Sequence, residues 1–193
     1  MMLLITGGSG SGKSAYGEER ICSMPGKKRI YVATMIPWDE ECRKKIQKHR
    51  LQRSEKNFET VEKYRDIQEL VFPPHSAVLL ECLSNVAADE MFRSEGIWED
   101  SADKLAEKLV QGVRRLKEQA DSLVVITNEV FSDGNRYDET TETYIQALGK
   151  ANCLLAAMAD EVAEVVWGIP VKRKISGDPP DAGTEGRNAG WIC

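Results

Sequence analysis

Gly7-Gly8-Ser9-Gly10-Ser11-Gly12-Lys13-Ser14 lies between the apolar run Met2-Leu3-Leu4-Ile5 and a helix-like segment from Ala15 to Ile21. The order is therefore strand, loop and helix, and the loop satisfies the phosphate-loop motif G-x-x-x-x-G-K-[ST] in full. In such a loop, glycines let backbone N–H groups point inward, and the N-terminus of the next helix adds partial positive charge. The alternative is a flexible Gly/Ser turn, which would not require Lys-Ser at this offset. We expect the loop to bind a nucleoside triphosphate.

Three side chains have predicted roles in phosphoryl transfer. Lys13 is a candidate catalytic residue that contacts the β- and γ-phosphates, and the Ser14 hydroxyl is placed to coordinate Mg²⁺ at the first helical turn. Further along, Ala77-Val78-Leu79-Leu80-Glu81 is a short apolar run that ends in an acid. This pattern predicts a core strand whose Glu81 carboxylate meets Mg²⁺ directly or through water. A role for Glu81 as a base, or as a surface residue at a strand end, stays open.

Length and composition narrow the class of protein. A chain of 193 residues can bury the core of one domain without disulfides or bound metal. Its formal charge of −5 argues against a nucleic-acid partner. The five cysteines are odd in number and form no C-x-x-C pair, so neither a zinc site nor a disulfide framework is expected. Because no apolar stretch is long enough to span a bilayer, we expect a cytoplasmic enzyme with reduced thiols.

Strands and helices alternate along the chain. The predicted strands are Met2–Ile5, Arg29–Thr34, Phe58–Glu62, Ala77–Glu81, Leu123–Thr127 and Val162–Trp167, the last of which is expected to close the sheet. The predicted helices are Ala15–Met24, Asp39–Arg53, a turn at Asp66–Val71, Trp98–Ala120 and Thr140–Met158, the last with Tyr144, Leu148, Leu154 and Leu155 inward. This order predicts an α/β, P-loop NTPase-like fold with a mostly parallel sheet, helices on both faces and the ligand outside the carboxyl ends of the strands.

The expected domain covers residues 1–174. Residues 175–193 are rich in Gly, Pro, Asp and Asn and contain little to bury, so this segment is predicted to be a flexible tail.

A more specific pattern lies in the first third of the chain. Ala33-Thr34, Asp39-Glu40-Glu41, Ile46-Gln47-Lys48-His49-Arg50-Leu51-Gln52-Arg53 and Phe58-Glu59-Thr60-Val61-Glu62 follow A-T…D-x-x-M…R-I-x-x-H-R-x-x-R-P…W-x-T-x-E. Further matches are Leu80-Glu81-Cys82-Leu83, Thr127-Asn128-Glu129-Val130, Gly149 with Asn152, Ala159-Asp160-Glu161-Val162 and Gly168-Ile169-Pro170. From about residue 2 to residue 174, the chain resembles the bifunctional adenosylcobinamide kinase/adenosylcobinamide-phosphate guanylyltransferase family of cobalamin assembly.

The resemblance implies two reactions that use Mg²⁺. The first phosphorylates the aminopropanol hydroxyl of adenosylcobinamide at the expense of a triphosphate, ATP or GTP. In the second, the histidine matching His49 attacks the α-phosphorus of GTP, releases pyrophosphate, holds GMP as a phosphoramidate and passes it to adenosylcobinamide phosphate. A neutral imidazole is a good nucleophile near neutral pH, and Arg50 and Arg53 are suited to stabilise the developing phosphate charge.

The same resemblance implies the site residues and the partners. Nucleotide contacts are expected from Gly7, Gly8, Ser9, Gly10, Ser11, Gly12, Lys13, Ser14, Ala33, Thr34, Met35, Arg50, Leu51, Gln52, Arg53, Glu62 and Glu81. The implied partner is a small-molecule corrinoid, and the implied assembly is a homotrimer. The charge and the short apolar stretches predict no nucleic-acid partner and no membrane span. His75 matches nothing in the motif and is predicted to be a loop residue.

Several positions depart from the family pattern. Gly10 stands where the family usually has an arginine, and Phe131-Ser132-Asp133-Gly134-Asn135-Arg136 replaces Gly-x-Gly-Ile-Val-Pro. Tyr144-Ile145-Gln146 replaces an aromatic-Arg-Asp sequence, and Ser54 and Phe58 replace Pro and Trp. Two alternatives therefore stay open: a kinase for another small alcohol that lacks guanylyl transfer, and a GTP-binding protein without transfer activity.

Overall fold

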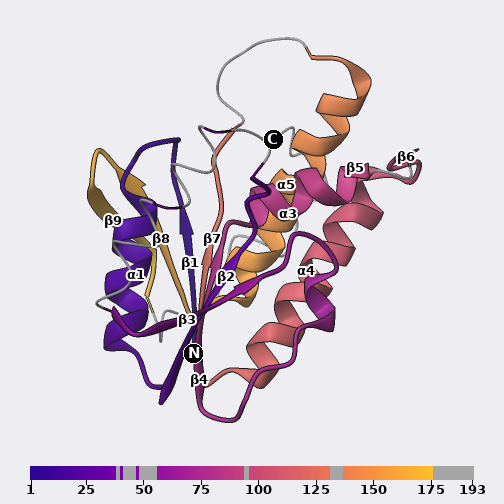
Figure 1. Cartoon of the computed structure of the whole chain (residues 1–193). Helices are drawn as coiled ribbons and strands as arrows, with labels where there is room; N and C mark the ends of the chain where they lie inside the picture. Colours follow the sequence, from indigo (N-terminus) through magenta and orange to yellow (C-terminus); the bar gives the residue numbers. More distant parts are fainter. Residues whose placement is uncertain (38–39, 41–46, 48–55, 94–95, 131–136, 176–193) are drawn as a thin grey trace.

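The computed structural model describes residues 1–37, 40, 47, 56–93, 96–130 and 137–175. Within these residues, a seven-stranded sheet has the order β3-β2-β4-β7-β1-β8-β9. Figure 1 shows α1 against one face of this sheet and α3, α4 and α5 against the other. The predicted α/β fold with helices on both faces is confirmed.

Six neighbouring strands of the sheet are parallel. They are β1 (Met2–Thr6), β2 (Lys28–Ala33), β3 (Phe58–Glu62), β4 (Ser76–Glu81), β7 (Ser122–Ile126) and β8 (Glu161–Val166). Strands β5 (Phe92–Arg93) and β6 (Gly96–Ile97) form a separate two-stranded sheet. Because parallel strands end at one edge, the segments after β1, β2, β3, β4 and β7 gather there.

The expectation that Val162–Trp167 closes the sheet is wrong. A seventh strand, β9 (Ile169–Lys174), pairs antiparallel with β8 and forms the edge. Trp167 and Gly168, with φ of 51° and 81°, make the turn that reverses the chain. The strand escaped prediction because it contains a proline and three cationic residues, as edge strands often do.

The helices lie close to their predicted positions, with one exception. Their bounds are α1 (Lys13–Ser23), α3 (Leu83–Met91), α4 (Ala102–Gln119), α5 (Glu139–Met158) and the 3₁₀ turn η2 (Ile67–Glu69). Helix α4 begins at Ala102 and not at Trp98, because the Ser101 hydroxyl caps it by accepting from the Lys104 N–H. Helix α3 was not predicted. Of the predicted helix Asp39–Arg53, Glu40 and Gln47 are described and are helical, and the rest lies outside the described residues.

The core has two parts that share the sheet. Side chains alternate along β1, so that Met2 and Leu4 join the cluster under α3, α4 and α5, whereas Leu3 and Ile5 join the cluster under α1. On α5, Tyr144, Leu148 and Leu155 face this core as predicted. Leu154 does not, and it is 50% exposed. One residue along a helix is a rotation of about 100°, which carries Leu154 away from the stripe that contains Leu155.

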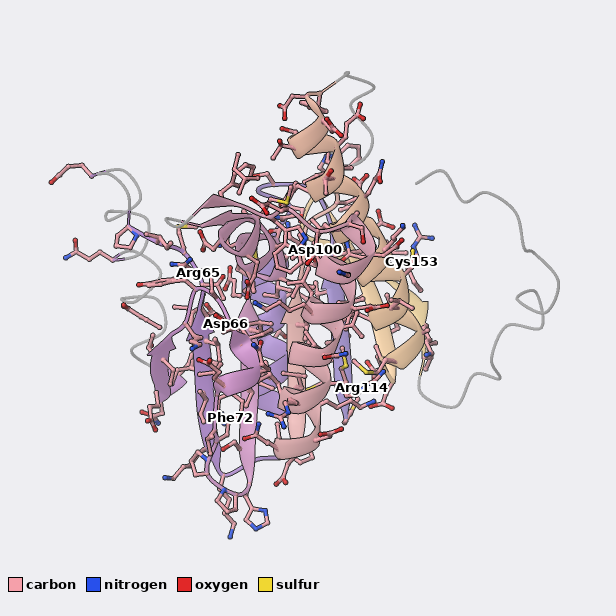
Figure 2. The ribbon with its side chains drawn as sticks, turned by 90° about the vertical axis from the view of Figure 1, so that its right-hand side faces the viewer. Arg65, Asp66, Phe72, Asp100, Arg114 and Cys153 are labelled. Carbon is pink, nitrogen blue, oxygen red and sulfur yellow. The ribbon has the colours of Figure 1, made fainter. Side chains whose placement is uncertain are left out.

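The segment between β3 and β4 is fixed to α4 by charge. Figure 2 shows Arg65, Asp66 and Phe72 on this segment, beside α4. The Lys108 ammonium on α4 lies 2.7 Å from Asp66 Oδ1 and 2.6 Å from the buried Glu90 Oε2 on α3. One lysine thus connects three parts of the helical layer.

No helix in the described part of the chain is long and apolar enough to cross a membrane.

Candidate active site

A cleft of about 1110 Å³ lies at the carboxyl edge of the sheet, between the phosphate loop and the segments that follow β2, β3, β4 and β7. Most of the predicted nucleotide contacts among the described residues line it, namely Ser9, Gly10, Ser11, Gly12, Lys13, Ser14, Ala33, Thr34, Met35, Glu62 and Glu81. Gly7 and Gly8 belong to the same loop without lining the cleft. His49, Arg50, Leu51, Gln52 and Arg53 lie outside the described residues, so their roles stay predictions.

The phosphate loop rests against the sheet through its backbone. A Cβ atom at Gly7 would lie 2.4 Å from the carbonyl oxygen of Val165, so this position requires glycine. On the other side, the Gly168 N–H at the β8–β9 turn donates to the Ser11 carbonyl at 2.8 Å. The first N–H groups of α1 have no side-chain cap, since Gly12 stands at the N-cap. The loop therefore presents N–H donors at a helix N-terminus that no side chain among the described residues caps, which is the arrangement that binds phosphate.

Lys13 is folded back onto this loop. Its side chain is 7% exposed, and Nζ donates to the Gly8 carbonyl at 2.7 Å. Burial lowers the pKa of the Lys13 ammonium, although nearby Cys82 and Glu81 act in the opposite direction. A phosphate in the loop would give the ammonium an anionic partner in place of the Gly8 carbonyl.

Glu81 ends β4 opposite the start of α1. The Ser14 hydroxyl donates to Glu81 Oε1, and the Tyr31 hydroxyl donates to Oε2 at 2.5 Å. The carboxylate is thereby aimed at the first turn of α1. No group of three or more His, Cys, Asp or Glu side chains within the described residues could hold a metal ion. Ser14 and Glu81 together offer two hard oxygen ligands, which suits Mg²⁺ because this ion keeps water and phosphate oxygens as its other ligands.

Thr34 fixes the end of β4. It is fully buried, its N–H donates to the Glu81 carbonyl at 3.1 Å, and its hydroxyl donates to the Cys82 carbonyl at 3.0 Å. The same hydroxyl accepts from the Cys82 N–H at 2.6 Å. The backbone N–H and the side chain of Thr34 thus hold the backbone that directly follows Glu81.

Several residues of the cleft were not predicted as site residues. They include Glu18, Tyr31, Lys56, Asn85 and Asn128. Lys56 forms an ion pair with Glu18 on α1, and this pair brings a second cation to the cleft. The one available signal was Thr127-Asn128-Glu129-Val130, a polar sequence directly after a buried strand.

His75 lies in a turn with φ of 62°, directly before β4 and therefore at the opposite end of the sheet from the cleft. It is confirmed as a loop residue.

The chain matches the family described as cobinamide kinase / cobinamide phosphate guanyltransferase over residues 3–173. It is 32% identical over 187 residues to the bifunctional adenosylcobalamin biosynthesis protein CobU of Escherichia coli, with 90% of this chain and 100% of that protein covered. The protein of the same name from Salmonella typhimurium gives the same identity and coverage. The solved structure of the flagellar accessory protein FlaH from Methanocaldococcus jannaschii is similar over 91% of this chain and 78% of that chain, with 10% identity and a TM-score of 0.40. That likeness is too low to bear on function.

Proposed function

Because the chain belongs to the cobinamide kinase / cobinamide phosphate guanyltransferase family, we propose that it catalyses both reactions in cobalamin biosynthesis. It phosphorylates adenosylcobinamide and then transfers GMP from GTP to adenosylcobinamide phosphate. The observation that carries this proposal is the cleft itself. Ser9–Ser14 of the phosphate loop and Glu81 line one cleft of a chain that matches the family over residues 3–173.

In the kinase reaction, the loop N–H groups bind the triphosphate, and Lys13 exchanges its contact with the Gly8 carbonyl for the β- and γ-phosphates. Ser14 and Glu81 would hold Mg²⁺, which when bound neutralises charge on the phosphates. Tyr31 keeps the Glu81 carboxylate turned toward Ser14. The contribution of these residues to the rate is positioning and charge stabilisation.

The guanylyl transfer is assigned to His49. Its basis is the match of Ile46–Arg53 to the family motif, since these residues other than Gln47 lie outside the described part of the chain. The imidazole attacks the α-phosphorus of GTP, the bond to pyrophosphate breaks, and GMP stays on the histidine until it passes to adenosylcobinamide phosphate. Glu62 and Ala33–Met35, which line the described cleft, are the proposed contacts of this nucleotide.

The remaining predictions rest on the resemblance and the composition alone. These are the use of both ATP and GTP, the homotrimer and the cytoplasmic location. The division into a domain of residues 1–174 and a flexible tail also stays a prediction.

The direct experiment follows the conversion of adenosylcobinamide with Mg²⁺ and either ATP or GTP by mass spectrometry. We expect adenosylcobinamide phosphate with a triphosphate donor, followed by the GDP-linked corrinoid when GTP is present. A single-activity kinase would stop at the phosphate, and a binding protein would form neither product.

The variant Lys13→Ala tests the site within the same assay. Loss of one cationic contact to the transferred phosphate should lower phosphoryl transfer by about 10²–10³-fold. The free energy of unfolding should fall by only about 1 kcal/mol, because one hydrogen bond to Gly8 is lost. Lys28→Ala, an exposed lysine at the other end of the sheet, is the matched control and should retain activity. Wild-type turnover by Lys13→Ala would contradict the assigned role.

A further inference from the structure

We propose that Asn128 binds the acceptor alcohol of the kinase reaction through its side-chain oxygen. This inference rests on the proposed function and adds to it a residue that holds the corrinoid substrate. It starts from the position of β7, which lies between β1, the strand of the phosphate loop, and β4, the strand of Glu81. In the register of the sheet, Ile126 pairs with Ile5 on one side and with Glu81 on the other.

The chain after β7 continues along the phosphate loop. The Thr127 N–H donates to the Ile5 carbonyl at 2.9 Å, and the Glu129 N–H donates to the Gly7 carbonyl at 3.2 Å. Asn128 stands between these two contacts and lines the cleft together with Lys13 and Glu81. It therefore lies where the end of a bound triphosphate and an incoming hydroxyl would meet.

The Asn128 side chain is held in place by its nitrogen. Nδ2 donates to the buried Ser84 Oγ at 2.6 Å. The backbone carbonyl of Asn128 accepts from Asn152 Nδ2 at 3.3 Å, and Asn152 also accepts from the Thr127 hydroxyl at 2.8 Å. Contacts from α3 and α5 thus fix both the backbone and the amide group.

This arrangement leaves the side-chain oxygen for a ligand. Among the described residues, none donates a hydrogen bond to Asn128 Oδ1. An amide oxygen accepts hydrogen bonds, so it favours a hydroxyl over the oxygens of a phosphate. The polar group that fits it in this reaction is the alcohol of the acceptor.

In the transfer step, the alcohol oxygen forms a bond to the γ-phosphorus, and the bond from that phosphorus to the bridging oxygen breaks. The electron pair leaves with the nucleoside diphosphate, and the proton leaves the alcohol oxygen for solvent water only after the bond to phosphorus has formed. A hydrogen bond from the hydroxyl to Oδ1 orients the alcohol oxygen for attack. This hydrogen bond positions the acceptor alcohol and takes no part in binding the triphosphate.

The test compares Asn128→Ala with the wild-type enzyme in three measurements. We expect kcat/KM for adenosylcobinamide to fall by about 10–100-fold, the effect of one well-placed hydrogen bond. The KM for the triphosphate and the incorporation of label from α-labelled GTP into the protein should change less than about twofold, because neither involves the alcohol. If Asn128→Ala impairs corrinoid turnover, triphosphate binding and label incorporation to the same extent, Asn128 has a structural role and the proposal is overturned. An unchanged kcat/KM for adenosylcobinamide would also overturn it.

Two further variants keep the test decisive. Ser84→Ala removes the contact that holds Nδ2 but leaves Oδ1 in place, so its loss in kcat/KM should be smaller than that of Asn128→Ala. Asn128→Asp keeps an oxygen acceptor of the same shape, and at saturating triphosphate it should retain more activity toward the corrinoid than Asn128→Ala. The reverse order in either comparison would contradict the proposal. If the wild-type enzyme does not phosphorylate the corrinoid at all, the proposed function fails instead.

Discussion

The Glu81 carboxylate shows how a single residue connects sequence to chemistry. It ends an apolar strand because a charged group cannot remain within the buried sheet, and the end of that strand lies at the cleft. There, Ser14 and Tyr31 each donate to one of its oxygens. The Ser14 and Glu81 oxygens that share a hydrogen bond are the two ligands that we propose for Mg²⁺.

A second carboxylate, Asp89 on α3, predicts a pH effect on stability. Burial raises the pKa of Asp89 to about 6, with Glu90 adding to the shift and Arg65 opposing it. An aspartate in an unfolded chain titrates near about pH 4, so between these values the folded protein holds the proton more tightly. The stability that Asp89 contributes is therefore full below about pH 4 and is lost as the pH rises through about 6.

The variant Asp89→Asn stays neutral at every pH and isolates this effect. Urea unfolding of both proteins between pH 4 and pH 7 should show the variant gaining stability relative to the wild type as the pH rises. A difference between the two proteins that does not change with pH would refute the raised pKa.

At the scale of helices and strands, what the sequence predicted depended on how each element was stabilised. The strands with continuous apolar runs, such as β4 and β7, were predicted because both of their faces are buried. Helix α3 was missed because it has only nine residues and follows β4 after a single residue. Strand β9 was missed because its exposed, cationic sequence gains its structure from pairing with β8.

The ion pairs of α4 give a prediction about the helical layer. Lys108→Met would remove the ammonium that lies 2.6 Å from Oε2 of Glu90, whose side chain is 1% exposed, at a cost of about 3 kcal/mol in the free energy of unfolding. Lys104→Met is the matched control on the same helix. Lys104 lies 2.6 Å from Asp100, the same separation as Lys108 from Glu90, but both side chains of this pair are exposed, so stability should change little. Equal effects in chemical denaturation would show that burial of Glu90 is not the deciding factor.

At the scale of the whole molecule, the fold brings distant segments to one cleft. The motif predicted the phosphate loop, and the resemblance to the family pointed to Glu62 and Ala33–Met35, which line the cleft and stay predicted contacts of the nucleotide. Tyr31 and Lys56 could not be assigned from the sequence, because only the order of the strands shows that they face the same space. For Asn128, the polar sequence directly after β7 was the one signal. Two reactions can share this cleft, since both begin with a bound triphosphate and differ in which phosphorus is attacked.

We propose that the second reaction, guanylyl transfer, depends on His49. Incubation with Mg²⁺ and GTP labelled at the α-phosphate should leave label on the denatured protein through a P–N bond that acid cleaves and alkali tolerates. GTP labelled at the γ-phosphate should leave none by this route, because attack at the α-phosphorus releases the other two phosphates. His49→Ala should abolish the label, whereas His75→Ala, at the far end of the sheet, should retain it. Protein that binds GTP but never acquires the α-label, or a His49→Ala variant that still does, would contradict guanylyl transfer through His49.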